Sequence, residues 1–280
     1  YIYTYKCILS SAKGQSMKTQ AFLNAKTVFS IEEFDDFCRS HQNAKPTSCR
    51  QLLKYHLGTG RVKQIRKALY LSTPPGKTVV ADPYLVCSKM APDSVLAYHT
   101  ALQFYGKAYS YWSSYIYLSH SRLRPFEYEG QTFKPVLFPQ SLVKKGEEMY
   151  GVNTEDSHGE DLRVTSLERT MVDVMQRPEL AGGWEEIWRS LEMIEYFDFA
   201  VVFRYVELLG NATTAAKVGF FLEQHRGQLM VDDEYLERLV RLRPKSPHYF
   251  DRSHKGSNTL ISKWNLVVPD TVLKRSWEEQ

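Results

Sequence analysis

The chain has 280 residues, of which 43% are hydrophobic and 24% charged, with a net charge of +4 and a mean hydropathy of −0.41. This composition is typical of a globular protein and excludes a largely disordered chain. No apolar run approaches the roughly 18–20 residues that a membrane-spanning helix needs, and the first ten residues are too polar for a signal peptide. We therefore expect a cytoplasmic protein without a membrane partner. The length is about twice that of a typical domain of roughly 150 residues, which favours two domains.

Charge is distributed unevenly along the chain. Residues 1–80 contain 13 lysines and arginines but only four acidic residues, a net charge of +9, whereas residues 81–280 carry a net charge of −5. No acidic residue occurs between Phe37 and Ala81. A basic module joined to a mildly acidic one predicts a polyanionic partner for the first module.

Residues 1–80 are predicted to form three helices followed by a hairpin. Ser30 and Glu33 form a capping box that starts the second helix, while Thr47 or Ser48 caps the third. The expected elements are helices at 16–25, 30–38 and 47–57, then strands at 61–65 and 68–72. This order is that of a winged helix-turn-helix.

The third helix has a strongly sided pattern. At 100° per residue, Cys49, Leu52, Leu53 and Leu57 fall on one arc. The opposite arc contains Thr47, Arg50, Gln51 and Lys54, with Ser48 at the helix start. Such residues donate hydrogen bonds to phosphates and base edges, so we expect this helix to bind DNA. A solvated basic surface is the alternative.

The hairpin, or wing, contributes four further cations: Arg61, Lys63, Arg66 and Lys67. Basic side chains beside a recognition helix reach the phosphates that flank the site it reads. The alternating pattern does not sort the two faces of the first strand, so it does not decide which of the four contact DNA.

Residues 81–280 are predicted to form a larger mixed α/β domain, which makes the whole chain α/β (α+β). The expected elements are helices at 84–90, 97–105, 166–175, 184–194, 199–209, 214–225 and 233–242, and strands at 115–119, 125–128, 132–134 and 162–165. Glu129-Gly130 is a predicted hairpin turn.

No convincing catalytic or cofactor-binding pattern occurs, so we expect a protein that is not an enzyme and has no cofactor and no metal site. Phosphate-binding loops, nucleophile elbows and dinucleotide fingerprints are absent. We interpret His99 as a hydrogen-bonded structural histidine and Arg169 with Asp173 as an i, i+4 salt bridge. The acidic stretch Asp156–Asp161 favours a solvated loop over a metal site. The four cysteines lack metal or disulfide spacing and are expected to be reduced.

Four segments, in their order and spacing, resemble the AbiEi-type antitoxins, the transcriptional regulators of type IV toxin–antitoxin and abortive phage-infection systems. These segments are Gly58–Tyr70, Asp82–Asp93, Tyr98–Gly106 and Val164–Asp173. The resemblance covers roughly residues 17–225, and more weakly a last strand at 264–269. The chain departs from the family at Ala68-Leu69, where a glycine is usual, and at Phe104-Tyr105, where a histidine is common.

This resemblance implies a repressor that binds inverted repeats in double-stranded operator DNA and neutralises a cognate nucleotidyltransferase toxin. It assigns DNA binding to residues 1–80 and toxin neutralisation to residues 81–280. Two alternatives remain open at this stage: a nuclease delivered to DNA by the basic module, and a transcription factor whose larger domain senses a small ligand. A second basic stretch, residues 238–255, has no role that the sequence decides.

Overall fold

The computed structural model describes residues 18–42, 46–76 and 78–277, and its fold is mixed α/β, as expected from the sequence. The chain divides into two compact units, one that ends at Pro92 and one that begins at Asp93. Each unit has its own buried hydrophobic cluster.

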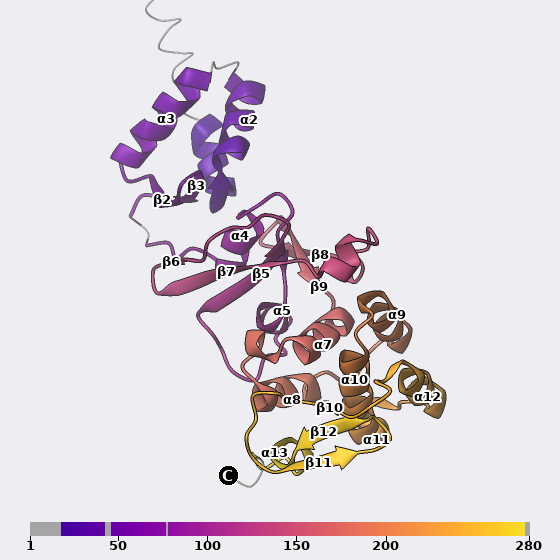
Figure 1. Cartoon of the computed structure of the whole chain (residues 1–280). Coiled ribbons are helices and arrows are strands. Elements are labelled where there is room, and N and C mark those ends of the chain that lie inside the picture. The colour runs from indigo at the N-terminus through magenta and orange to yellow at the C-terminus, as the bar shows by residue number, and fades with distance from the viewer. Residues whose placement is uncertain (1–17, 43–45, 77, 278–280) are drawn as a thin grey trace, which may run out of the picture. The chain divides into compact units, whose positions relative to one another are not determined.

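The first unit consists of helices and a small antiparallel sheet with strand order β1-β3-β2. In chain order it contains a helix over residues 18–25, β1 (Val28–Ser30), α2 (Ile31–Gln42), α3 (Pro46–Gly58), β2 (Val62–Arg66), β3 (Leu69–Ser72) and α4 (Pro83–Ser88). Helices α2 and α3 pack side by side, with the sheet at one end of them (Figure 1). Strand β1 was not predicted from the sequence.

Local capping determines where α2 begins. The Ser30 amide donates to Glu33 Oε2 over 2.8 Å, and the Glu33 amide donates to Ser30 Oγ over 3.2 Å, which confirms the predicted capping box. Phe34 and Cys38 of α2 are fully buried in a cluster that also contains Leu53 of α3. Burial of this apolar face holds α2 and α3 together.

The first unit extends beyond the expected domain boundary at residue 80. The Lys89 ammonium lies 2.6 Å from Glu33 Oε1, and Arg66 donates to Met90 Sδ over 3.6 Å. These contacts attach the segment after α4 to the N-terminal module, which is why the observed division follows Pro92.

Some expectations fall partly or wholly outside the described residues. The predicted start of the first helix at Ser16, the thiol of Cys7 and the side chain of Thr47 are among them. Within the described chain, Cys38, Cys49 and Cys87 are buried free thiols.

The second unit contains a six-stranded mixed sheet with strand order β6-β7-β5-β4-β9-β8. Its strands are β4 (Val95–Leu96), β5 (Ser114–Ser119), β6 (Phe126–Tyr128), β7 (Gln131–Leu137), β8 (Val152–Ser157) and β9 (Glu160–Thr165). The pairs β5–β7 and β4–β9 are parallel, and the other neighbours are antiparallel.

Two hairpins in this sheet use the same kind of turn. Glu129 and Gly130 both have positive φ, 47° and 77°, which confirms the predicted turn between β6 and β7. His158 and Gly159, with φ of 56° and 80°, connect β8 to β9 in the same way. The interpretation of Asp156–Asp161 as a solvated loop was therefore wrong, because this polar stretch pairs as two strands.

Helices and a second, three-stranded sheet complete the unit. The helices are α5 (His99–Phe104), α6 (Gln140–Val143), α7 (Leu167–Gln176), the 3₁₀ turn η1 (Pro178–Leu180), α8 (Trp184–Glu192), α9 (Phe199–Leu209), α10 (Ala212–Gln224), α11 (Arg226–Leu229), α12 (Asp233–Leu242) and α13 (Asp270–Leu273). The small sheet has the order β10-β12-β11 and consists of β10 (His248–Tyr249), β11 (Asn258–Ile261) and β12 (Leu266–Pro269). None of the described helices has the length and apolarity needed to cross a membrane.

Helices α5, α7, α8 and α10 lie between the two sheets of this unit (Figure 1). Helix α7 packs against α5, α9 and α10, and α10 also contacts β12. Gly219 allows that last contact, because a Cβ at this position would lie 2.2 Å from the ring of the buried Trp264. The Ser166 hydroxyl accepts from the Arg169 amide and caps α7, as predicted.

A buried ion pair lies at the centre of the second unit. Arg169 Nε is 3.3 Å from Asp173 Oδ2, and both side chains are completely buried. Arg169 Nη1 also donates to the carbonyls of Glu148 and Tyr150 over 2.7 and 2.8 Å. The Tyr205 hydroxyl donates to Asp173 Oδ1 over 2.6 Å. The predicted i, i+4 salt bridge is confirmed, and it connects α7 to α9 and to the chain that leads into β8.

Candidate nucleic-acid interface

Helix α3 presents a polar face that contains no acidic residue. Cys49 and Leu53 are only 1% and 4% exposed and anchor the helix in the core of the first unit. Arg50, Gln51 and Lys54 are all exposed, as the helical pattern predicts. The helix therefore divides into a buried apolar side and an outer side made of hydrogen-bond donors.

The start of α3 differs from the expectation. The helix begins at Pro46, so Thr47 and Ser48 lie in its first turn rather than at the cap position. Proline is favoured at the first helical position because its missing N–H has no partner there and its φ suits a helix. Ser48 is exposed and adjoins the polar face.

Tyr55 also belongs to this side of α3, although the sequence analysis did not select it. Its side chain is 63% exposed, and it follows Gln51 by one helical turn. An exposed tyrosine offers a hydroxyl for hydrogen bonding and a flat ring for packing on a sugar. The sequence does contain a sign of this role, because the helical pattern places Tyr55 outside the arc of apolar residues.

The hairpin divides its four predicted cations into two pairs. Lys63 and Lys67 are exposed, whereas Arg61 and Arg66 are half-buried. A register shift between Gln64 and Arg66 places a bulge at Ile65. Because of this bulge, Val62 and Ile65 are both buried despite their odd spacing, which explains why simple alternation did not sort the strand.

We call the exposed side chains of Ser48, Arg50, Gln51, Lys54, Tyr55, Lys63 and Lys67 the basic face. Within the described residues, none of its four cations forms an ion pair. Among the acidic residues of this unit, Glu33 contacts Lys89 and Asp36 contacts Arg39 on α2, and Asp82 accepts from the Tyr84 amide at the start of α4. No described residue therefore neutralises the four cations of the basic face through an ion pair, which favours an external polyanion.

His56 adds no positive charge to this region. Its ring is half-buried, and burial, together with the nearby Arg61 cation, lowers the pKa of the imidazole. The neutral form is therefore favoured at pH 7. The ring of Tyr55 packs edge-on against it at 5.3 Å between centroids.

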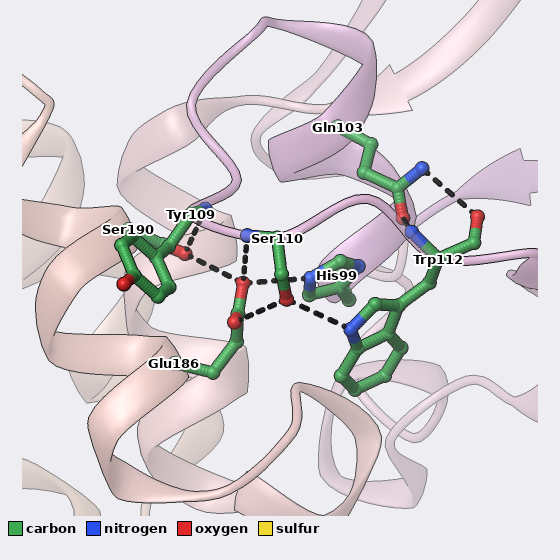
Figure 2. Close-up of polar contacts among 7 residues, drawn as sticks. All are labelled: His99, Gln103, Tyr109, Ser110, Trp112, Glu186 and Ser190. Carbon is green, nitrogen blue, oxygen red and sulfur yellow. Dashed lines mark hydrogen bonds and ion pairs between the residues drawn. The ribbon is translucent and has the colours of Figure 1, made fainter.

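In the second unit, Figure 2 shows a polar cluster around the buried His99. His99 Nε2 lies 3.0 Å from Glu186 Oε1, and its ring stacks on Trp112 at 3.8 Å. The amide and hydroxyl of Ser110 both donate to Glu186, as does the hydroxyl of Ser190. His99 is thus buried and hydrogen-bonded, as interpreted from the sequence.

In this cluster the serine hydroxyls do not pair with the imidazole. The Ser110 hydroxyl donates to the Glu186 carboxylate rather than to the imidazole (Figure 2). Burial opposes the negative charge of Glu186, but the hydrogen bonds from Ser110 and His99 outweigh this effect and lower the pKa of the carboxyl. The ionised Glu186 therefore holds the segment 109–112 against α8.

The sequence also offered a candidate metal site and a second basic stretch, both far from the basic face along the chain. Among the described residues, no three histidine, cysteine, aspartate or glutamate side chains are grouped so as to hold a metal ion. In the stretch 238–255, Arg241, Lys245, Arg252 and Lys255 are exposed on the second unit.

The comparisons with known proteins bear on the fold alone. No family model matches the chain, and no curated protein matches it. A crystal structure of the RV2827C protein from Mycobacterium tuberculosis matches with a TM-score of 0.61 at 17% sequence identity, over 94% of each chain. The chain is therefore similar in fold to that protein over almost its whole length.

Proposed function

We propose that this chain is a DNA-binding transcriptional repressor that reads double-stranded operator DNA with the basic face. The observation that carries the proposal is the acid-free, exposed polar side of α3 beside a hairpin with exposed lysines. The order of helix, strand, helix, helix and hairpin is also that of a winged helix-turn-helix, whose third helix enters the major groove.

Each part of the basic face has a distinct role in this proposal. Arg50 and Lys54 suit the two acceptors on a guanine edge, and Gln51 suits the donor and acceptor of an adenine. Lys63 and Lys67 on the hairpin contact flanking phosphates, which increases affinity for any sequence. Inverted repeats in the operator would bring two copies of the chain onto adjacent half-sites.

We further propose that the chain is an antitoxin without catalytic activity or a cofactor of its own, and that residues 93–280 neutralise a cognate nucleotidyltransferase toxin. This part of the proposal is supported by the sequence resemblance to AbiEi-type antitoxins. The resemblance includes the segment Val164–Asp173, which carries the buried Arg169–Asp173 pair.

A separation-of-function variant tests both parts in the full-length chain. The triple variant R50A/Q51A/K54A removes two charges and an amide from exposed positions of α3, so the fold should be retained. It should lose repression of a reporter driven by the chain's own promoter, yet still rescue cells that co-express the cognate nucleotidyltransferase toxin.

The variant R241A/K245A is the matched control, because it also removes two exposed cations, but from the second unit. It should repress and rescue like the wild type. Full repression by the triple variant would refute the role of α3, and loss of rescue by the folded triple variant would refute the division between the two units. Failure of the wild-type chain to rescue would refute the antitoxin assignment.

A further inference from the structure

The second unit contains a pocket of about 650 Å³ beside the start of α10. We call it the Lys217 pocket. Its wall includes Thr213 and Lys217 of α10, Trp184 of α8, Tyr249 and Arg252 at or after β10, and the two carboxylates of Glu179 and Asp251. The pocket lies wholly within residues 93–280, and neither the proposed repressor nor the proposed antitoxin activity uses it.

Lys217 is a buried cation with too few partners. Its side chain is 8% exposed, and Nζ donates to the carbonyl of Met175 over 3.2 Å. The ammonium also lies 4.8 and 5.2 Å from the ring centres of Trp184 and Phe250. An ammonium carries three N–H groups, and no carboxylate of the described chain forms an ion pair with this one. Buried charges are normally paired, so an acceptor from outside the chain is expected.

The charged neighbours of Lys217 do not supply that acceptor. Asp251 accepts from Trp184 Nε1 over 2.9 Å and from the amide and hydroxyl of Ser253 over 2.7 and 2.6 Å. Glu179 pairs with Arg177 over 2.9 Å. Both carboxylates are thus already engaged by other donors.

The start of α10 adds further donors to the same wall. Asn211 Oδ1 accepts from the Thr214 amide over 3.1 Å, which leaves the amide of Thr213, a residue of the wall, without an acceptor inside the helix. The positive end of this 13-residue helix favours an anion. Thr213 and Lys217 are one turn apart and therefore lie on the same side of α10.

From this arrangement we propose that the Lys217 pocket binds a phosphate-bearing small molecule. The phosphate oxygens accept hydrogen bonds from Lys217 Nζ and from the first turn of α10, and Arg252, which also lines the pocket, adds a second positive charge. The pocket is much larger than a phosphate ion, and Tyr249, which is 56% exposed, offers a ring against which the rest of the ligand packs.

Protonation of Lys217 gives the proposal a pH signature. Burial lowers the pKa of Lys217 to about 8, and Arg252 contributes in the same direction, while Asp251 and Glu179 oppose it. Tyr249 also lines this wall, and His248 beside it hydrogen-bonds to Thr213 over 2.8 Å. A phosphate favours the charged ammonium, so binding raises the pKa of Lys217 and is accompanied by proton uptake above pH 8. The affinity therefore weakens as the pH rises through 8.

Calorimetric titration of the full-length chain with inorganic phosphate and with adenosine monophosphate tests the proposal. K217M, which keeps an apolar stem of similar length, should weaken binding of both probes at least about tenfold. R252Q, at an exposed position, should weaken it about threefold. K245M is the matched control, since it removes an exposed lysine that does not line the pocket, and its affinity should equal that of the wild type.

The outcomes separate this pocket from the basic face. Unchanged affinity in both K217M and R252Q would overturn the proposal and place the phosphate elsewhere, for instance on the DNA-binding unit. If K245M weakens binding of the probes as much as K217M does, the phosphate is attracted diffusely by positive charge, and the proposal is overturned. The absence of binding heat with both probes would overturn it as well. If K217M does not fold, R252Q and the pH dependence of the wild type decide the matter.

Discussion

Replacement of Asp173 by alanine is expected to destabilise the second unit by about 3–5 kcal/mol. The substitution leaves the fully buried guanidinium of Arg169 without its charged partner and the hydroxyl of Tyr205 without its acceptor. Single domains are stable by only about 5–15 kcal/mol, so much of the stability of this unit would be lost. Urea unfolding of the full-length chain, followed by tryptophan fluorescence, measures the change.

Two further variants separate the buried charge from general effects of substitution. Glu179→Ala removes an acid from the exposed Arg177–Glu179 pair, and it should cost less than about 1 kcal/mol. The double variant R169M/D173L replaces the pair by apolar side chains and should be more stable than Asp173→Ala alone. If Asp173→Ala and Glu179→Ala lower the free energy of unfolding by equal, small amounts, the Arg169–Asp173 pair does not hold this unit together.

Single substitutions on the basic face are expected to separate reading of the base sequence from attachment to the backbone. Arg50→Ala should reduce the difference in binding free energy between operator and random DNA by about 1–3 kcal/mol, because a bidentate base contact is lost. Lys67→Ala should weaken binding to operator and to random DNA by the same factor. It should also reduce the slope of the logarithm of the binding constant against the logarithm of salt by about one. Fluorescence anisotropy with labelled duplexes gives both quantities.

Arg39→Ala serves as the control for these variants. Arg39 is an exposed cation of the first unit, but it lies on α2 and is paired with Asp36. Its loss should change neither affinity nor discrimination by more than about twofold. The assignment of α3 as the reading helix fails if Lys67→Ala alters discrimination and Arg50→Ala does not.

Several features encoded by neighbouring residues were predictable from the sequence, but the cap of α3 was not, because the helix begins at Pro46. The capping box of Ser30 and Glu33 and the cap at Ser166 were confirmed because both depend on residues three positions apart. The exposed face of α3 followed from helical periodicity alone. Even the Arg169–Asp173 pair needed only an i, i+4 spacing.

Features that depend on distant partners were not predictable. Strand β1 has three residues and is defined by pairing with β3, some forty residues further along the chain. Polar strand β8 lacks an apolar alternation and was therefore interpreted as part of a loop. The Lys217 pocket was missed because its walls come from α8, α10 and the chain around β10. In the sequence its only sign was a lysine within the apolar run of α10.

Binding of the full-length chain to its own promoter DNA, across a series of salt concentrations, tests the central claim most directly. If the basic face contacts about five or six phosphates, the logarithm of the binding constant should fall against the logarithm of salt with a slope near −5. The promoter duplex should bind at least about a thousandfold more tightly than a scrambled duplex of the same length and composition. Equal affinity for the two duplexes, or affinity that does not change with salt, would contradict the assignment of this chain as a DNA-reading repressor.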